Sequence, residues 1–197
     1  LSTVEDYYRH GIDLLHPKTI YMGYPGTFVL ELPVFQAMAA SLYKLFGPQL
    51  AIVRLLNILI GTVSAWLLYL IIKAYFDQMV GLFATMIYWL APLNLIYHRS
   101  MLIDPMAVCC GLASFYLLDN LTACIVPQAQ RGPGKSKDAW RWLAFGVATI
   151  LTAMIKALYL WPAVLLLTVR LFNRRFRPDA RLGAIIGIFG LSGVCFL

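Results

Sequence analysis

Charged residues are scarce in this sequence of 197 residues: only 13% are Asp, Glu, Lys or Arg, where a typical soluble domain has about 25%. Hydrophobic residues make up 61% of the chain. So few charges cannot cover a globule of this size with side chains that water tolerates. This composition excludes a soluble enzyme, a disordered chain and a fibrous repeat, and it predicts an integral membrane protein.

Acidic residues are fewer than basic ones, nine against sixteen, which gives a net charge of +7. In a soluble protein such an excess would suggest a nucleic-acid partner. No basic stripe alternates here with exposed aromatic residues, as grooves for single-stranded nucleic acid require. Lys and Arg concentrate on the cytoplasmic side of membrane proteins. We therefore expect no nucleic-acid partner and use the basic residues to orient the chain.

Cysteines are also few, and all four lie inside apolar runs. Their positions have neither the spacing of a metal site nor that of a disulfide framework. We expect them to be small hydrophobic residues of the interior. They are Cys109, Cys110, Cys124 and Cys195.

The chain divides into a polar beginning and a series of apolar runs. Residues 1–48 are expected to form an extracytoplasmic loop that ends in an amphipathic helix over 34–46, which is too short to span and lies in the membrane interface. Residues 51–197 are expected to form transmembrane helices. These cover about 51–72, 79–97, 105–125, 142–155, 157–171 and 183–197, the last of them truncated.

Residues 142–171 fit either one long span or a hairpin of two short helices that turns at Lys156. Basic residues flank this segment on both sides, and both flanks therefore look cytoplasmic. An even number of crossings follows, which favours the hairpin. This topology places residues 1–48, the turn 98–104 and Lys156 together on the non-cytoplasmic side.

Three ionisable residues on that side are candidates for chemistry, and each has a simpler explanation. Asp104, before Pro105, is either a helix cap or a functional carboxylate. Lys156 either extends to the surface at a hairpin tip or neutralises a phosphate. Glu31 is either a solvated acid near a helix N-terminus or a carboxylate of the same site.

The tyrosines of the polar beginning, Tyr24 among them, fit either an interfacial belt or platforms for a sugar. A polar loop, an interfacial helix and several ionisable groups thus share one membrane face. Such a face suits chemistry between a lipid-borne substrate and a partner from the lumen or periplasm. A transporter would predict symmetric halves and ionisable groups at mid-bilayer, and the sequence shows no internal repeat.

The runs 24–47 (YPGTFVLELPVFQAMAASLYKLFG) and 51–76 (AIVRLLNILIGTVSAWLLYLIIKAYF) resemble glycosyltransferases of the GT-C superfamily that use polyprenyl-phosphate sugars. The closer resemblance is to the dolichyl-phosphate-mannose protein mannosyltransferase and aminoarabinose-transferase-like group. It covers about residues 6 to 172, and the last motif has Ile155 where Thr is usual. The matching motifs are Glu31-Leu32-Pro33, Leu45-Phe46-Gly47, Arg54-Leu55, His98-Arg99-Ser100 with Asp104-Pro105, and Met154-Ile155-Lys156.

The resemblance implies an all-α, multi-span helical bundle of the GT-C type and an inverting transfer of a sugar to an acceptor hydroxyl. Asp104 and Glu31 would be the catalytic carboxylates, with Glu31 as the ligand if a divalent metal ion is the cofactor. The substrate-binding residues would be Lys156, Arg99, His98 and Tyr24. The family's principal aspartate precedes a segment that Tyr7-Tyr8-Arg9-His10-Gly11 matches, so we expect it upstream of Leu1, in a longer protein of which this chain is a fragment.

The partners implied are a polyprenyl-phosphate sugar, a protein, lipid or glycan acceptor, and membrane lipid. The expected location is a multi-pass position in a bacterial inner membrane or an ER-type membrane, with the active face non-cytoplasmic. Two alternatives remain open from the sequence. One is a non-catalytic membrane scaffold of the same fold, and the other is a transporter.

Overall fold

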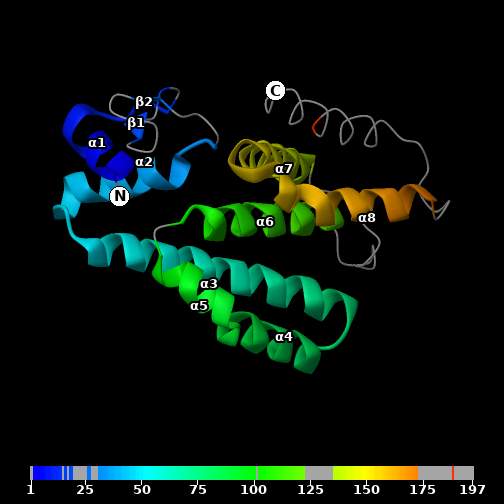
Figure 1. The fold of residues 1–197 in the computed structure, drawn as a ribbon. Helices are drawn as coiled ribbons and strands as arrows, with labels where there is room; N and C mark the ends of the chain where they lie inside the picture. The colour runs from blue at the N-terminus through cyan, green and yellow to red at the C-terminus, as the bar shows by residue number, and fades with distance from the viewer. Residues whose placement is uncertain are drawn as a thin grey trace.

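The computed structural model describes residues 2–14, 16, 18–19, 26–27, 31–100, 102–122, 135–172 and 188. This part of the chain is almost entirely helical (Figure 1). Two short strands, β1 (Lys18–Thr19) and β2 (Gly26–Thr27), pair antiparallel. The helices are α1 (Ser2–His10), α2 (Val34–Phe46), α3 (Leu50–Tyr75), α4 (Gln78–Leu90), α5 (Pro92–Arg99), α6 (Asp104–Thr122), α7 (Lys135–Lys156), the 3-10 turn η3 (Ala157–Leu160) and α8 (Trp161–Phe172).

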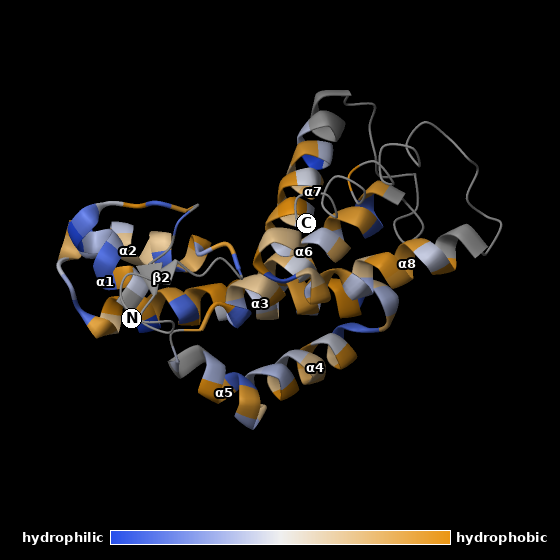
Figure 2. Cartoon of the chain, turned by 45° about the horizontal axis from the view of Figure 1, so that its top comes forward, coloured by the Kyte–Doolittle hydropathy of each residue, from blue (hydrophilic) through white to orange (hydrophobic). Residues whose placement is uncertain are grey.

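Two helical stretches are long and apolar enough to cross a membrane: Leu50–Tyr75, which is α3, and Trp140–Val169. Hydrophobic residues lie along much of α3, α4 and α8 (Figure 2). Many of them are exposed, including Trp66 at 62% and Ile87 at 69%. Exposed apolar surface of this extent fits contact with lipid tails.

The stretch expected as one span over 79–97 is divided into α4 and α5 at Ala91-Pro92. Pro92 has no backbone N–H, so the carbonyl of Tyr88 lacks its usual helical donor. The side-chain amide of Asn94 donates to that carbonyl instead, at 2.7 Å. Pro92 therefore causes the break, and Asn94 supplies the hydrogen bond that the carbonyl of Tyr88 would otherwise lack.

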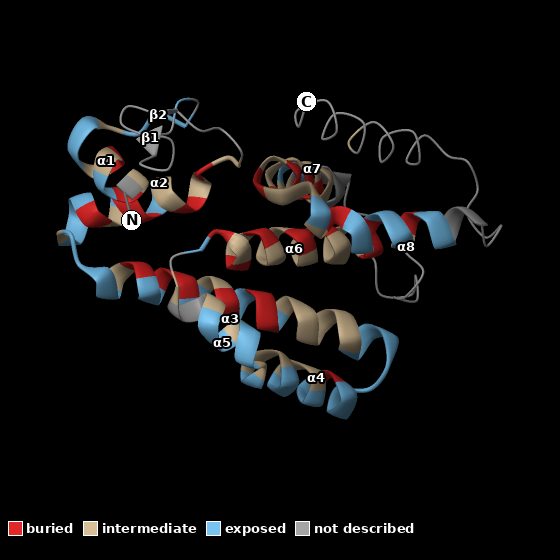
Figure 3. Cartoon of the chain, in the orientation of Figure 1, coloured by how far each residue is buried: buried red, intermediate tan, exposed pale blue. Residues whose placement is uncertain are grey.

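Helix α6 is the centre of the fold, with α3 on one side and α7 on the other (Figure 1). Buried residues follow its length (Figure 3). Small side chains let the α6 and α7 backbones approach, and the hydroxyl of Thr149 donates to that of Ser114 at 3.4 Å. Of the four cysteines, Cys109 and Cys110 on α6 are free and partly buried, whereas Cys124 and Cys195 lie outside the described residues.

The helical course changes direction at Lys156. Helix α7 ends there, the backbone of Lys156 is extended, and η3 makes a single tight turn before α8 begins. The two helices leave this corner in different directions (Figures 1 and 2). Both contact α6. The further span expected over 183–197 lies outside the described residues except for Ile188.

The polar beginning of the chain forms a helix, α1, that the sequence analysis did not predict. Val4 and Tyr7 of α1 are 1% exposed and pack on Phe35, Ala39 and Tyr43 of α2. The bounds of α2, Val34–Phe46, coincide with the predicted amphipathic helix.

The hydroxyl of Tyr7 donates to the backbone carbonyl of Asp13 at 2.5 Å. Burial, with Asp13 and Asp6 nearby, raises the pKa of Tyr7 to about 12. The tyrosine therefore remains a neutral hydrogen-bond donor at physiological pH, and it ties the end of α1 to the loop that follows.

Candidate functional site

Three segments that are distant in sequence meet at one end of α6 and α7. The backbone N–H of Leu32 donates to the carbonyl of Met154 at 3.0 Å, which joins the segment before α2 to the last turn of α7. Ile103 and Ile155, 6% and 1% exposed, are buried in one cluster with Phe35. These buried residues fix the backbone immediately before Asp104 and Lys156.

The side chains of Glu31, Asp104, Lys156 and Tyr159 contact one another there, and we call them the Lys156 cluster. The ammonium nitrogen of Lys156 lies 2.5 Å from Oδ1 of Asp104 and 3.3 Å from Oε1 of Glu31. The hydroxyl of Tyr159 donates to the same Oδ1 of Asp104 at 3.4 Å. The charged side chains are 17–31% exposed, so the cluster is open to a ligand.

The Lys156 cluster carries two carboxylates and one ammonium, and its net charge is −1 when all three are ionised. Lysine has three N–H donors, and the contacts with Asp104 and Glu31 account for two of them. Both contacts to Asp104 end on Oδ1. These contacts thus leave one oxygen of each carboxylate, Oδ2 of Asp104 and Oε2 of Glu31, and one N–H of Lys156 without a partner within the cluster.

The described residues do not fit the metal site that the sequence suggested at Glu31. No group of three His, Cys, Asp or Glu side chains lies close enough together there to hold an ion. The two carboxylates that do converge are bound to Lys156, whose positive charge would repel a divalent cation.

Of the residues proposed from sequence, Asp104, Glu31 and Lys156 come together. Asp104 does begin α6, and its carboxylate also bonds to Lys156 and Tyr159. His98 and Arg99 lie on α5, but their side chains, like the whole of Tyr24, are outside the described residues.

Sequence reasoning missed Tyr159. The tight turn η3 begins directly after the extended residue Lys156 and carries Tyr159, whose hydroxyl reaches the same Asp104 oxygen that Lys156 contacts. A tyrosine three residues beyond a lysine in an apolar run was the only available signal. Its meaning depends on a tight turn that the apolar pattern does not reveal.

Asn57, in the first third of α3, contacts the backbone that precedes Asp104. Its side chain is fully buried, and its amide nitrogen lies 2.5 Å from the carbonyl oxygen of Ser100 and 3.4 Å from that of Tyr97. These carbonyls belong to the end of α5 and the residue after it. The amide nitrogen of Asn57 therefore connects α3 to the end of α5, whereas its buried Oδ1 has no partner among the described residues.

Asn57→Ala is expected to destabilise the protein by about 1–3 kcal/mol, because the carbonyls of Ser100 and Tyr97 lose their donor. The measurement is thermal unfolding of the purified protein in detergent. Thr62→Ala is the matched control, since the exposed Thr62 hydroxyl bonds only to Ile58 of its own helix and its loss should have little effect. Equal unfolding temperatures for the two variants would contradict this role of Asn57.

Comparison with known proteins agrees with the motifs. The family model described as dolichyl-phosphate-mannose-protein mannosyltransferase matches residues 31–194. The match starts at Glu31 and includes every member of the Lys156 cluster. No curated protein and no solved structure gives a significant match.

Proposed function

The chain belongs to the dolichyl-phosphate-mannose-protein mannosyltransferase family, a family of membrane glycosyltransferases, and we propose that it transfers a sugar from a polyprenyl phosphate to an acceptor hydroxyl on the non-cytoplasmic face. In this proposal the helices described above are part of a multi-span bundle of the GT-C type. The donor diffuses in the bilayer and reaches the Lys156 cluster from the side.

The observation that carries the proposal is the convergence of Glu31, Asp104 and Lys156. These residues come from three elements and are separated by 52 residues or more along the chain, yet the Lys156 nitrogen contacts both carboxylates. Ionisable residues in apolar helices are rare, and where they occur they pair with one another and often mark functional sites. Their arrangement supplies the two groups that the reaction needs, a carboxylate and a cation.

The proposed reaction is a single displacement at the anomeric carbon. The acceptor oxygen bonds to that carbon while the bond from carbon to the phosphate oxygen breaks, and the polyprenyl phosphate leaves with the electron pair. The acceptor proton passes to a carboxylate, a step for which general-base catalysis contributes about 10²–10⁴-fold. Attack opposite the leaving group inverts the anomeric configuration.

Within this scheme, Oδ2 of Asp104 faces the acceptor side, as a proton acceptor or as the partner of another carboxylate that accepts the proton. The remaining N–H of Lys156 contacts the departing phosphate, whose developing charge it stabilises. Tyr159 and Lys156 together hold Oδ1 of Asp104. Glu31 lies at the longer distance from Lys156 and orients the ammonium between the two acids.

The direct test is transfer of radiolabelled sugar from polyprenyl-phosphate donors to membrane acceptors by the full-length protein. Wild type should transfer sugar from one such donor. Glu31→Gln should reduce transfer about tenfold at equal membrane abundance, because a neutral amide oxygen still accepts from Lys156 but orients it less strongly. If wild type transfers nothing from any such donor, the proposed reaction is wrong.

A further inference from the structure

A pocket beside the α1–α2 pair shares no residue with the Lys156 cluster. It has a volume of about 250 Å³ and is formed where α1, the end of α2 and the beginning of α3 come together. Its lining combines two opposite charges, two phenol rings and two apolar residues. The lining residues are Glu5, Tyr8, Arg9, Tyr43, Pro48 and Leu50.

The polar part of this pocket is an ion pair that lies beside two tyrosine rings. The guanidinium of Arg9 lies 2.6 Å from the carboxylate of Glu5, and the two side chains are 67% and 58% exposed. The rings of Tyr8 and Tyr43 meet edge to face, with centroids 6.2 Å apart. Burial and Glu5 raise the pKa of Tyr43, which keeps its hydroxyl neutral. The lining therefore has no net charge but offers one charge of each sign.

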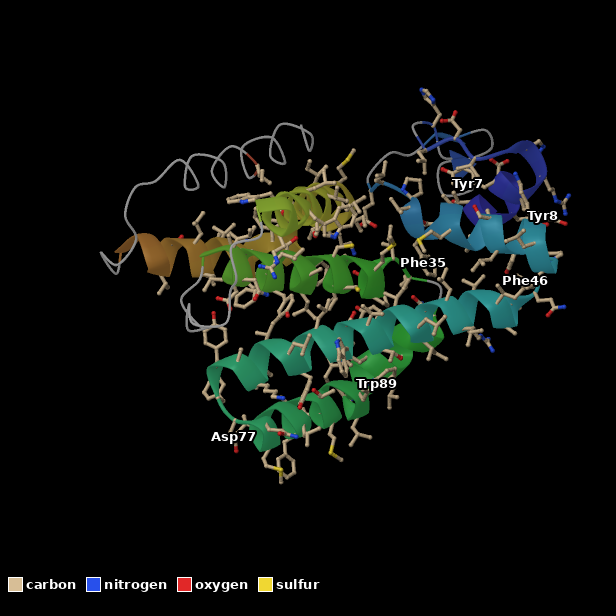
Figure 4. The ribbon with its side chains drawn as sticks, turned by 180° about the vertical axis from the view of Figure 1, so that it is seen from behind. Tyr7, Tyr8, Phe35, Phe46, Asp77 and Trp89 are labelled. Atoms are coloured by element: carbon tan, nitrogen blue, oxygen red, sulfur yellow. The ribbon has the colours of Figure 1, made fainter. Side chains whose placement is uncertain are left out.

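The pocket lies where α3, a helix long and apolar enough to cross a membrane, begins. Leu50 is the first residue of the spanning helix α3. Leu45 and Phe46, just before the pocket residue Pro48, are 75% and 66% exposed. Tyr8 and Phe46 lie at the same end of the α1–α2 pair (Figure 4). Charges and tyrosines beside exposed apolar residues match the boundary between lipid head groups and acyl chains.

We propose that this pocket binds the head group of a zwitterionic phospholipid with a primary ammonium, of the phosphoethanolamine class. The phosphate binds the guanidinium of Arg9, and the ammonium binds the carboxylate of Glu5 beside the tyrosine rings. The acyl chains run along Leu50 and the exposed apolar residues next to it. An anionic head group would leave Glu5 facing a negative charge, and a choline head group has no N–H to donate to Glu5.

The bound lipid would replace the Glu5–Arg9 pair by two ion pairs with the same ligand. An exposed pair of this kind contributes little to folding, so both charges are available for exchange. The lipid would also bridge α1, α2 and α3, the elements that join the polar beginning of the chain to the membrane. This inference does not depend on the proposed transfer reaction.

The test is native mass spectrometry of the full-length protein released from nanodiscs that contain equal amounts of phosphatidylethanolamine, phosphatidylcholine and phosphatidylglycerol. Wild type should retain phosphatidylethanolamine about tenfold more than either other lipid. Glu5→Gln and Arg9→Gln should each reduce that retention about tenfold, because each removes one charge-assisted hydrogen bond. Lys44→Gln is the matched control: Lys44 is an exposed charge on α2 outside the pocket, and retention should not change.

Three results would overturn the inference. They are equal retention of the three lipids by wild type, preferential retention of phosphatidylglycerol, and displacement of the lipid by a soluble methyl glycoside, which would assign the pocket to a sugar. Asp104→Asn should retain the lipid normally, whatever it does to transfer. Unchanged unfolding temperatures of the Glu5 and Arg9 variants would show that lost binding is not lost folding.

Discussion

Asp104→Asn is expected to reduce sugar transfer by the full-length protein at least about a hundredfold, the lower range of what a carboxylate contributes in general acid–base catalysis. The amide is nearly isosteric and can still accept hydrogen bonds from Lys156 and Tyr159, so the geometry should survive. The charge that balances Lys156 and the oxygen that takes a proton are lost. The measurement is the initial rate of transfer from a radiolabelled polyprenyl-phosphate sugar, at equal protein abundance in the membrane.

Asp119→Asn is the matched control for this prediction. Asp119 is also an aspartate of α6, it is 8% exposed, and it accepts a hydrogen bond from Tyr75 at 2.9 Å. It lies at the opposite end of the helix from Asp104, so its loss should leave transfer within about threefold of wild type even if stability falls by about 1–3 kcal/mol. If both variants lose the same activity, Asp104 has a structural role only.

Gly111→Ala is expected to lower sugar transfer, although Gly111 is not a member of the Lys156 cluster. A Cβ atom at Gly111 would lie 2.6 Å from the backbone oxygen of Tyr159, which is closer than real atoms approach. The backbone of η3 must move away, and both Lys156 and Tyr159 move with it. Overpacking of this kind costs about 1–3 kcal/mol, and a displacement of about 1 Å at a reacting group can lower the rate about a hundredfold.

Gly146→Ala provides the comparison, because it places the same extra methyl group on the next helix. A Cβ at Gly146 would meet only the Cδ1 atom of Ile188, at 4.0 Å, which is ordinary contact. Alanine favours a helix over glycine by about 1 kcal/mol, so this variant should be as stable as wild type or more so. The paired measurements are unfolding temperature in detergent and transfer rate. If both variants keep the wild-type transfer rate, the close packing of η3 on α6 is contradicted.

Much of the candidate site follows from the sequence because charge is rare in it. Against an apolar background, Glu31, Asp104 and Lys156 stand out individually, and the positive-inside rule predicts one membrane face for all three. A shared membrane face does not determine which of the three side chains contact one another. The distances among the three depend on Leu32 bonding to Met154 and on the burial of Ile103 and Ile155, which are long-range contacts without a local pattern.

The fold was predictable to the extent that local patterns determine it. Helix α2 shows a clear amphipathic period and a Gly47-Pro48 end, and its bounds were predicted correctly. Helix α1 was missed because its residues are polar and its stability comes from packing Val4 and Tyr7 onto α2, a helix that begins more than twenty residues later. The break at Pro92 also has a local cause, the missing N–H of proline, but the run 79–97 is predominantly apolar and was therefore predicted as one span.

The hydrogen bond from Leu32 to Met154 has a consequence for how the protein is made. Its two residues are separated by about 120 positions, which corresponds to roughly ten seconds of synthesis at ordinary ribosomal speed. Glu31 and then Asp104 are added to the growing chain before Lys156, so the two negative charges are synthesised ahead of their counter-ion. The corner at Lys156 is therefore the part that completes the assembly. A chain that stalls before α7 emerges would leave the first loop undocked and open to quality-control proteases.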